Sequence, residues 1–482
     1  MWLFKIHITT LVKITKLSII ISLIAFLTFI LDHANRPDAG LYHLPYISML
    51  NEHKIIFGTV NLHFRFGHTS ILQYLSAIFN NVIFFDNGIL IPPALIYAGT
   101  LCFFFNEIVK SNLKIIKFIS FCFLVYTLTS MNRYSEFGND DPAHMFYFIV
   151  IIYFFKFKNY NFYKKDLIFK IIIFSTYCFL IKQFYIFVFI FPLYYLIIIS
   201  NKELIFNRTV FFCTSFIFLW ILKNIIVSGC MIYPASITCL KNLNWHNQNE
   251  TTYVKNSSEA WAKAFPDRID QSINEEKYVK GFAWINTWVT NHFYVTLKKI
   301  TPFIIVISIV LLINFKKNKI LSSFFKNRFL LFLLGSNLIF SLFWFFKFPT
   351  FRYGAAYLVS LLSLLILSFF YKTIINIKYK IKNASIIVLI LLAIIIIAKN
   401  TKRILINLNY KYVDYPWPKK NSFTESNSKN YNIPSKINDK IFYYYAHPYS
   451  LCMYSISPCT NFGDVKLKVN FLPFNYYIFI KD

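Results

Sequence analysis

The stretch "RFLLFLLGSNLIFSLFWFFKFPTFRYGAAYLVSLLSLLILSFFYK", residues 328–372, decides the fold. Its two apolar runs, 328–346 and 354–371, are each long enough to cross the hydrocarbon core of a bilayer as a helix. The short turn "PTFRYG" (349–354) joins them, and basic residues flank the far ends of the pair. The pattern predicts a helical hairpin in a membrane, with its basic ends in the cytoplasm and its turn on the exported face.

The rest of the chain has the same character. Of its 482 residues, 57% are hydrophobic and 20% aromatic, against about 45–50% apolar residues in a soluble domain. Further apolar runs bring the expected total to about eleven transmembrane helices, the others lying at 17–31, 88–106, 113–131, 144–157, 166–181, 184–200, 209–227, 300–315 and 384–398. The expected fold class is therefore an all-α polytopic membrane protein.

The charge distribution orients the chain. The net charge of +29 comes from 50 Lys+Arg against 21 Asp+Glu, and the basic residues cluster in alternate short loops between the expected spans. This positive-inside pattern accounts for the charge better than a nucleic-acid partner, and we expect no such partner. It predicts a retained first helix with a cytoplasmic N-terminus, and a C-terminus on the periplasmic side of a bacterial inner membrane.

Three regions are expected outside the bilayer. The spans form a transmembrane domain over residues 1–399, with exported loops at 32–87 and 228–299, and residues 400–482 form a small exported C-terminal region. Within the first loop, Ser70–Phe85 is apolar but short, which favours an interfacial helix. The end of the tail, "KLKVNFLPFNYYIFI", alternates enough to predict strands.

The expected topology divides the eight cysteines into two groups of four. Four fall within expected spans and are expected to be core thiols: Cys102, Cys122, Cys178 and Cys213. The other four form two close exported pairs, Cys230 with Cys239 and Cys452 with Cys459. We expect two local disulfides in an oxidising periplasm, with free thiols as the alternative.

Ionisable residues from several segments fall on the exported face. They lie in "DHANRPDAGLYH" (32–43), "VNLHFRFGH" (60–68), "FGNDDPAH" (137–144) and "PTFRYG", and near the outer ends of two further spans. Ionisable residues at a membrane boundary are candidates for function. Each also has a structural alternative, because an aspartate can cap a helix, a histidine can pack as a ring and a long basic side chain can reach to headgroups. The candidates are Asp38, Asp140 and Asp141 for catalysis, and His43, His63, Arg65, His144, Lys182, Lys223 and Arg352 for substrate binding.

This mixture suits sugar transfer from a lipid phosphate. Transfer to a hydroxyl needs a carboxylate to accept the proton as the C–O bond forms, and a lipid-linked phosphate needs cations near headgroup level. Arg352, Lys182 and Arg65 could hold the phosphate, while His43 and His63 would orient acceptor or donor. No cofactor is indicated, although the Asp140/Asp141 pair could bind a divalent cation.

The arrangement resembles the GT-C superfamily of membrane glycosyltransferases, which includes protein O-mannosyltransferases and aminoarabinose transferases. In that superfamily the first exported loop carries a catalytic aspartate, and Asp38 in "PDAGLYH" is the match; Asp140 and Asp141 correspond to a second acidic pair. The Asp-Glu pair typical of the mannosyltransferase first loop is absent here. The resemblance implies a GT-C-like fold with Asp38 as general base.

A closer resemblance is to a group of bacterial multi-pass membrane proteins without an assigned reaction. It is carried by "YHLPYISMLNEHKIIFGTVNLHFRFGHTS" (42–70), "KNIIVSGCMIYPASITCLKNLNW" (223–245), "FPTFRYG" (348–354) and "LCMYSISPCT" (451–460). We therefore expect a glycosyltransferase of cell-envelope polysaccharide biosynthesis, which uses a polyprenyl-phosphate-linked sugar and a cell-surface glycan or lipid acceptor. The alternatives are an O-antigen or capsule polymerase or ligase, a polysaccharide transporter or flippase, and a non-catalytic assembly factor.

Overall fold

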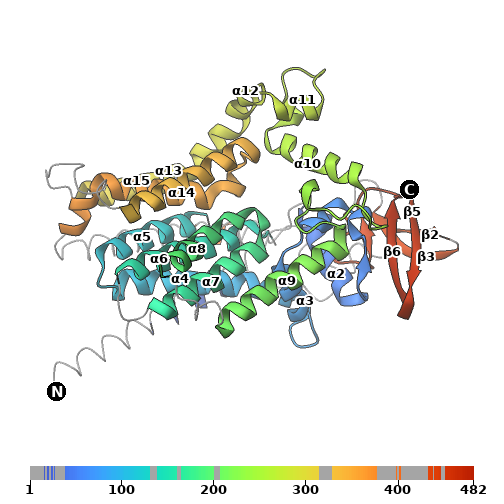
Figure 1. Ribbon diagram of the computed structural model, residues 1–482, viewed down its shortest axis with the longest axis horizontal. Coiled ribbons are helices and arrows are strands. Elements are labelled where there is room, and N and C mark those ends of the chain that lie inside the picture. The colour runs from blue at the N-terminus through green and yellow to red at the C-terminus, as the bar shows by residue number, and fades with distance from the viewer. Residues whose placement is uncertain are drawn as a thin grey trace.

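A computed structural model describes most of the chain and shows a helix bundle with two small sheets beyond one end of it (Figure 1). The described residues are 38–130, 138–159, 164–199, 207–313, 328–376, 432–437, 439–446 and 451–481, with scattered positions within 16–27 and 398–402.

The apolar runs fold into helices whose ends lie within a few residues of the expected bounds. These helices are α4 (Ile91–Lys110), α5 (Lys114–Thr129), α6 (Asp140–Asn159), α7 (Lys164–Ile181), α8 (Ile190–Ile199), α9 (Arg208–Ser228), α13 (Tyr294–Ile313), α14 (Arg328–Lys347) and α15 (Phe351–Asn376). The hairpin expected from residues 328–372 is confirmed as α14 and α15, joined by a short turn.

Fewer segments than expected qualify as spans by length and composition. Among the described residues, five helical segments are long and apolar enough to cross a membrane: Gly88–Lys110, Arg208–Ser228, Trp284–Leu312, Arg328–Lys347 and Phe351–Tyr371. The count of about eleven is not reached, because α5 has 16 residues, α8 has 10, and α6 and α7 carry several charged residues in their end turns. The expected spans 17–31 and 384–398 fall almost entirely outside the described residues.

The regions expected outside the bilayer contain short helices. The first loop holds η1 (Ala39–His43), α2 (Leu44–Glu52), η3 (Phe64–His68) and α3 (Ile71–Phe79), and the second holds α10 (Gln248–Ala262) and α11 (Glu275–Lys280). The second loop is shorter than expected, because α12 (Trp284–Trp288) and η10 (Val289–Phe293) run directly into α13. The apolar segment therefore begins at Trp284 rather than near residue 300.

The chain is mostly helical, as expected, but it also forms two three-stranded sheets. One has the order β1-β6-β5 and the other β2-β3-β4. The strands are β1 (Ile56–Phe57), β2 (Asn432–Ile437), β3 (Lys440–Ala446), β4 (Cys459–Thr460), β5 (Leu467–Leu472) and β6 (Tyr476–Lys481). The strands expected at the end of the tail are confirmed as the antiparallel pair β5 and β6, which turn through Pro473–Asn475.

The C-terminal region packs against the first loop, residues 32–87. Strand β1 from that loop pairs in parallel with β6, with Ile56 opposite Tyr477. Ser48 Oγ donates a hydrogen bond to the carbonyl oxygen of Ser455 at 2.7 Å, and Thr460 Oγ1 donates to that of Leu62 at 3.0 Å. The tail thus holds the loop that carries Asp38 and Arg65.

The bundle core is rich in aromatic rings. Phe123 on α5 stacks on Phe148 of α6 with ring centroids 4.3 Å apart, and Tyr147 donates a hydrogen bond to Asn337 Oδ1 on α14 at 2.9 Å. Large apolar side chains on α9, such as Phe211 at 67% exposed, point outward. Buried rings and an exposed apolar face are expected of helices that contact lipid on one side and pack on neighbours through van der Waals contacts on the other.

Candidate functional site

Asp38 lies directly before η1, at the start of the described part of the first loop. Its Oδ1 accepts a hydrogen bond from Arg65 Nη1 at 2.9 Å, and its Oδ2 accepts one from Arg352 Nη1 at 3.2 Å. Arg65 belongs to η3 and Arg352 to the first turn of α15. Three segments far apart in sequence therefore meet at one carboxylate.

Asp140 opens α6 and supplies a second carboxylate. Its Oδ1 accepts a hydrogen bond from Lys182 Nζ, and its Oδ2 lies 3.9 Å from Arg352 Nε. Lys182 is the extended residue between α7 and η6 (Gln183–Phe189). Burial acts to raise the pKa of Asp140, but the positive charges of Lys182 and Arg352 outweigh it and hold that pKa below its usual value.

We call these five residues the ion network: Asp38, Arg65, Asp140, Lys182 and Arg352. Their side chains keep between 18% and 34% of their surface accessible, so the network is open to a ligand. The convergence expected from the sequence is confirmed for these five. The roles assigned to them remain predictions.

Aromatic rings frame the arginines of the ion network. The Arg65 guanidinium lies 5.1 Å from the ring centre of Tyr42, and that of Arg352 lies 5.2 Å from Trp261 and 5.0 Å from Tyr353. Such cation–π contacts contribute about 0.5–2 kcal/mol each. The sequence analysis did not select these rings. Adjacency to a selected residue could have indicated the two tyrosines, whereas the tryptophan comes from α10 and has no such signal.

His144 and Asp141 support Arg352 from its backbone side. His144 Nε2 donates a hydrogen bond to the carbonyl oxygen of Arg352 at 3.0 Å, because a carbonyl can only accept. Nδ1 then faces Asp141 Oδ1 at 3.3 Å, without hydrogen-bond geometry. Both side chains are buried, so neither is placed to contact substrate directly.

His43 and His63 are also buried. Gln73 Oε1 accepts from the Ser70 backbone N–H, so its amide Nε2 is the donor to His43 Nδ1 at 3.1 Å. His63 Nδ1 accepts from the backbone N–H of Arg65 at 3.1 Å and so shapes the turn that presents this arginine. Burial lowers the pKa of His43 to about 4 and that of His63 to about 3, so both rings are neutral near pH 7.

Lys223 lies outside the ion network. It projects from α9, and its Nζ donates a hydrogen bond to Thr69 Oγ1 at 2.7 Å. The same atom lies 3.7 Å from the ring centre of Trp220.

Both expected disulfides are present. Cys230 pairs with Cys239 at the end of α9, and Cys452 pairs with Cys459 in the C-terminal region. The four cysteines expected to be core thiols are free.

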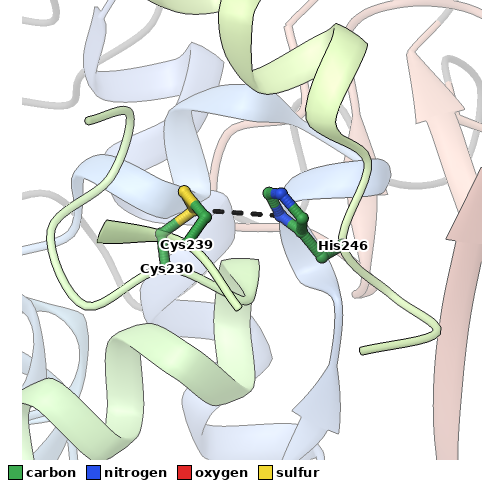
Figure 2. Close-up of side chains that lie close together, drawn as sticks. All are labelled: Cys230, Cys239 and His246. Atoms are coloured by element: carbon green, nitrogen blue, oxygen red, sulfur yellow. Dashed lines mark hydrogen bonds between the residues drawn. A yellow bond between two sulfur atoms is a disulfide. The ribbon is translucent and has the colours of Figure 1, made fainter. Parts of the chain in front are cut away.

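The described residues do not support a divalent-cation site at the Asp140/Asp141 pair, because the Asp140 carboxylate is paired with Lys182 and Arg352, and Asp141 is buried beside His144. One group in the described part of the chain brings three metal-type side chains within 4.8 Å: Cys230, Cys239 and His246 (Figure 2). Its two sulfur atoms are joined in a disulfide and so are not thiolate ligands. Neither group fits a resident metal ion.

The comparisons with known proteins identify a family. No curated protein and no solved structure matches this chain. One family model matches residues 2–359, well over half of the chain, and the match includes every member of the ion network. The chain therefore belongs to the family described as "Domain of unknown function (DUF8201)".

Proposed function

We propose that this chain is an integral membrane glycosyltransferase that works on the exported face of a bacterial inner membrane. Its donor is a sugar linked to polyprenyl phosphate, and its acceptor is a cell-surface glycan or lipid. The observation that carries the proposal is the ion network, in which two carboxylates and three cations from separate segments meet in a partly exposed cluster.

Asp38 is the better candidate for the general base. Each of its oxygens accepts one guanidinium hydrogen bond, and an ionised carboxylate has about four acceptor positions, so both oxygens can still accept the acceptor's O–H. The proton passes to this carboxylate as the new C–O bond forms and the bond from the anomeric carbon to the phosphate oxygen breaks. Polyprenyl phosphate leaves with the electron pair, and Arg65 and Arg352 flank the carboxylate to stabilise that negative charge.

Asp140 is less suited to this role. Its pKa is held below the usual value by Lys182 and Arg352, and a carboxylate with a lower pKa is a weaker base. Its contacts instead fix the guanidinium of Arg352 between two carboxylates. We assign Asp140 to positioning.

The finer topology belongs to the same proposal. The N-terminus is cytoplasmic, the C-terminus is exported, and the shorter or more charged helices α5 to α8 cross the membrane with the five longer segments. The basic loops support this orientation. So does the gathering of α2, α3, α10 and the sheets beyond one end of the bundle (Figure 1).

The test compares surface glycans and glycolipids by mass spectrometry. A deletion strain should lack a product that the parent strain makes, and the wild-type gene should restore it. Asp38→Asn keeps the size and hydrogen bonding of the side chain but removes the proton acceptor, and we expect product to fall by about 100-fold or more. The matched control is Glu276→Gln, an exposed carboxylate paired with Lys280 away from the ion network.

The outcome can also contradict the proposal. If Asp140→Asn abolishes product and Asp38→Asn does not, the base is Asp140. If Asp38→Asn, Asp140→Asn and Asp141→Asn all restore the product fully, the chain is not a glycosyltransferase of this kind.

A further inference from the structure

Lys223 is a basic residue in an apolar helix, and its contacts are with neutral groups. It lies within the candidate span Arg208–Ser228, near its exported end. No carboxylate of the described residues forms an ion pair with it; its contacts there are with Thr69 Oγ1 and the rings of Trp220 and Tyr74. Partly removing an ammonium from water without a counter-ion is unfavourable, and such residues in membrane helices are usually kept for a function.

The cations of the ion network differ in this respect. Arg65 and Arg352 share Asp38, and Lys182 is paired with Asp140. A ligand anion that bound one of these cations would compete with a carboxylate already in place. An anion that bound Lys223 would displace no carboxylate of the described chain.

His68 joins Lys223 to the ion network. It directly precedes Thr69, is exposed, and packs its ring against Tyr233 with centroids 5.3 Å apart. Although the residue is partly exposed, the protein packed around its ring disfavours the charged form, and the charges of Lys182, Arg65 and Lys223 also oppose a proton, so its pKa lies below the ordinary value. The ring is therefore neutral near pH 7 and offers one N–H donor.

We propose that Lys223, Thr69 and His68 form a phosphate-binding subsite beside the ion network. The ammonium supplies the charge, and the hydroxyl and the imidazole N–H supply directed donors to the phosphate oxygens. The outer face of α9 is apolar and exposed, with Phe216 at 52% and Leu219 at 59%, so a lipid chain has a surface beside the subsite. That the ligand is a prenyl phosphate rests on the proposed function. That the subsite binds a phosphate group rests only on the chemistry of its three side chains.

The experiment uses the full-length protein in detergent micelles with three probes. Farnesyl phosphate carries a phosphate on a prenyl chain, farnesol carries the chain alone, and inorganic phosphate carries the anion alone. Isothermal titration should show farnesyl phosphate binding, with farnesol at least tenfold weaker, because a charge-assisted hydrogen bond contributes about 1.5–3 kcal/mol and about 1.4 kcal/mol is tenfold. Inorganic phosphate that binds as tightly as farnesyl phosphate would support the subsite and assign it to free phosphate.

Variants localise the binding. Lys223→Gln should raise the Kd for farnesyl phosphate by about tenfold or more, whereas Lys223→Arg, which keeps the charge, should retain most of the affinity. The matched control is Lys280→Gln, an exposed lysine that pairs with Glu276 rather than with a residue of the subsite. The unfolding midpoint of each variant without probe, together with retention of both disulfides, establishes that it is folded.

The proposal is overturned if Lys223→Gln binds farnesyl phosphate as the wild type does while Lys182→Gln or Arg65→Gln loses binding. It is also overturned if farnesol and farnesyl phosphate bind equally. Its failure is distinct from failure of the proposed function. If Lys223→Gln binds normally and Asp38→Asn loses product, the subsite is wrong and the glycosyltransferase proposal stands. If Lys223→Gln loses binding and Asp38→Asn retains product, the subsite stands and the glycosyltransferase proposal is wrong.

Discussion

Arg352 contacts both carboxylates of the ion network, and His144, which lies outside the network, helps to hold it in position. Nη1 contacts Asp38, Nε lies near Asp140, and the backbone carbonyl accepts from buried His144. A planar guanidinium can bridge two carboxylates in this way because its donors point in fixed directions. A small shift in the backbone would therefore disturb both contacts.

His144 offers a test of this support. His144→Ala leaves the carbonyl of Arg352 without its donor, and we expect a loss of about 1–3 kcal/mol in the free energy of unfolding and a fall in product. His144→Gln places an amide N–H near the former Nε2 and should recover most of both. Thermal unfolding in detergent and the glycan assay measure the two effects. Equal behaviour of the alanine and glutamine variants would contradict the positioning role.

The buried histidines predict an acid-sensitive fold. In the unfolded chain a histidine binds a proton below about pH 6.5, but the pKa values of His43 and His63 in the folded chain are about 4 and about 3. The unfolded state therefore binds more protons over this interval. The stability these rings contribute is complete above about pH 6.5 and is lost as pH falls toward 4, by up to about 1.4 kcal/mol per pH unit for each ring.

Unfolding midpoints measured from pH 8 to pH 4 check this expectation. The double variant His43→Asn/His63→Asn keeps an acceptor near each Nδ1 but cannot titrate, so its midpoint should vary less with pH. Asp140, whose folded pKa is also lowered, loses its contribution only below about pH 3.8, outside this window. An unchanged pH profile in the double variant would show that other groups control acid unfolding.

At the scale of elements, the short strand β1 determines how the C-terminal region joins the first loop. Gly58 follows β1 with a φ of +69°, a conformation that favours glycine. A Cβ at this position would lie 2.4 Å from the carbonyl oxygen of Phe479 in β6 and 2.8 Å from Trp245 Cβ. The backbone of the two segments therefore approaches too closely for any other residue.

Gly58→Ala should consequently destabilise this junction. The positive φ alone costs about 1–3 kcal/mol, and the contact with a backbone oxygen adds to it. We expect a lower unfolding midpoint and faster proteolytic release of the C-terminal region. Gly99→Ala on α4 is the matched control, because a Cβ there meets nothing within 4 Å and alanine favours a helix. Equal stability of the two variants would show that β1 and β6 are not tightly joined.

The sequence predicted some elements better than others. Apolar runs and basic ends located α14 to within one residue and α15 to within five, because a long apolar run in a membrane has few alternatives to a helix. The start of the α12–η10–α13 run was missed, because its polar residues Thr287, Asn291 and His292 resemble a loop. The pairing of β1 with β6 was not predictable, since two residues of strand near position 56 carry no signal for a partner more than 400 residues away.

At the scale of the whole molecule, the candidate site was also predicted only in part. Topology alone brought five charged residues to one face, and the structure joins them in the ion network. The topology could not predict how deeply each side chain is buried. His43, His63 and His144 are in the right region but buried, and Trp261 reaches Arg352 from a loop whose fold has no local signal.

The shared face of these residues depends on the orientation of the bundle, which single-cysteine labelling can test. The four free cysteines are first replaced, and exposed positions are then substituted one at a time in intact cells. Lys241→Cys and Glu276→Cys lie in the second exported loop and should react with a membrane-impermeant maleimide. Asp166 and Arg208 lie in the first turns of α7 and α9, next to basic loops. Asp166→Cys and Arg208→Cys should therefore react only after the membrane is permeabilised. All four side chains are exposed, so differences in labelling report the side of the membrane rather than burial. Reaction of Asp166→Cys in intact cells would show that the bundle has the opposite orientation. The ion network would then face the cytoplasm, and glycosyl transfer on the exported face would be ruled out.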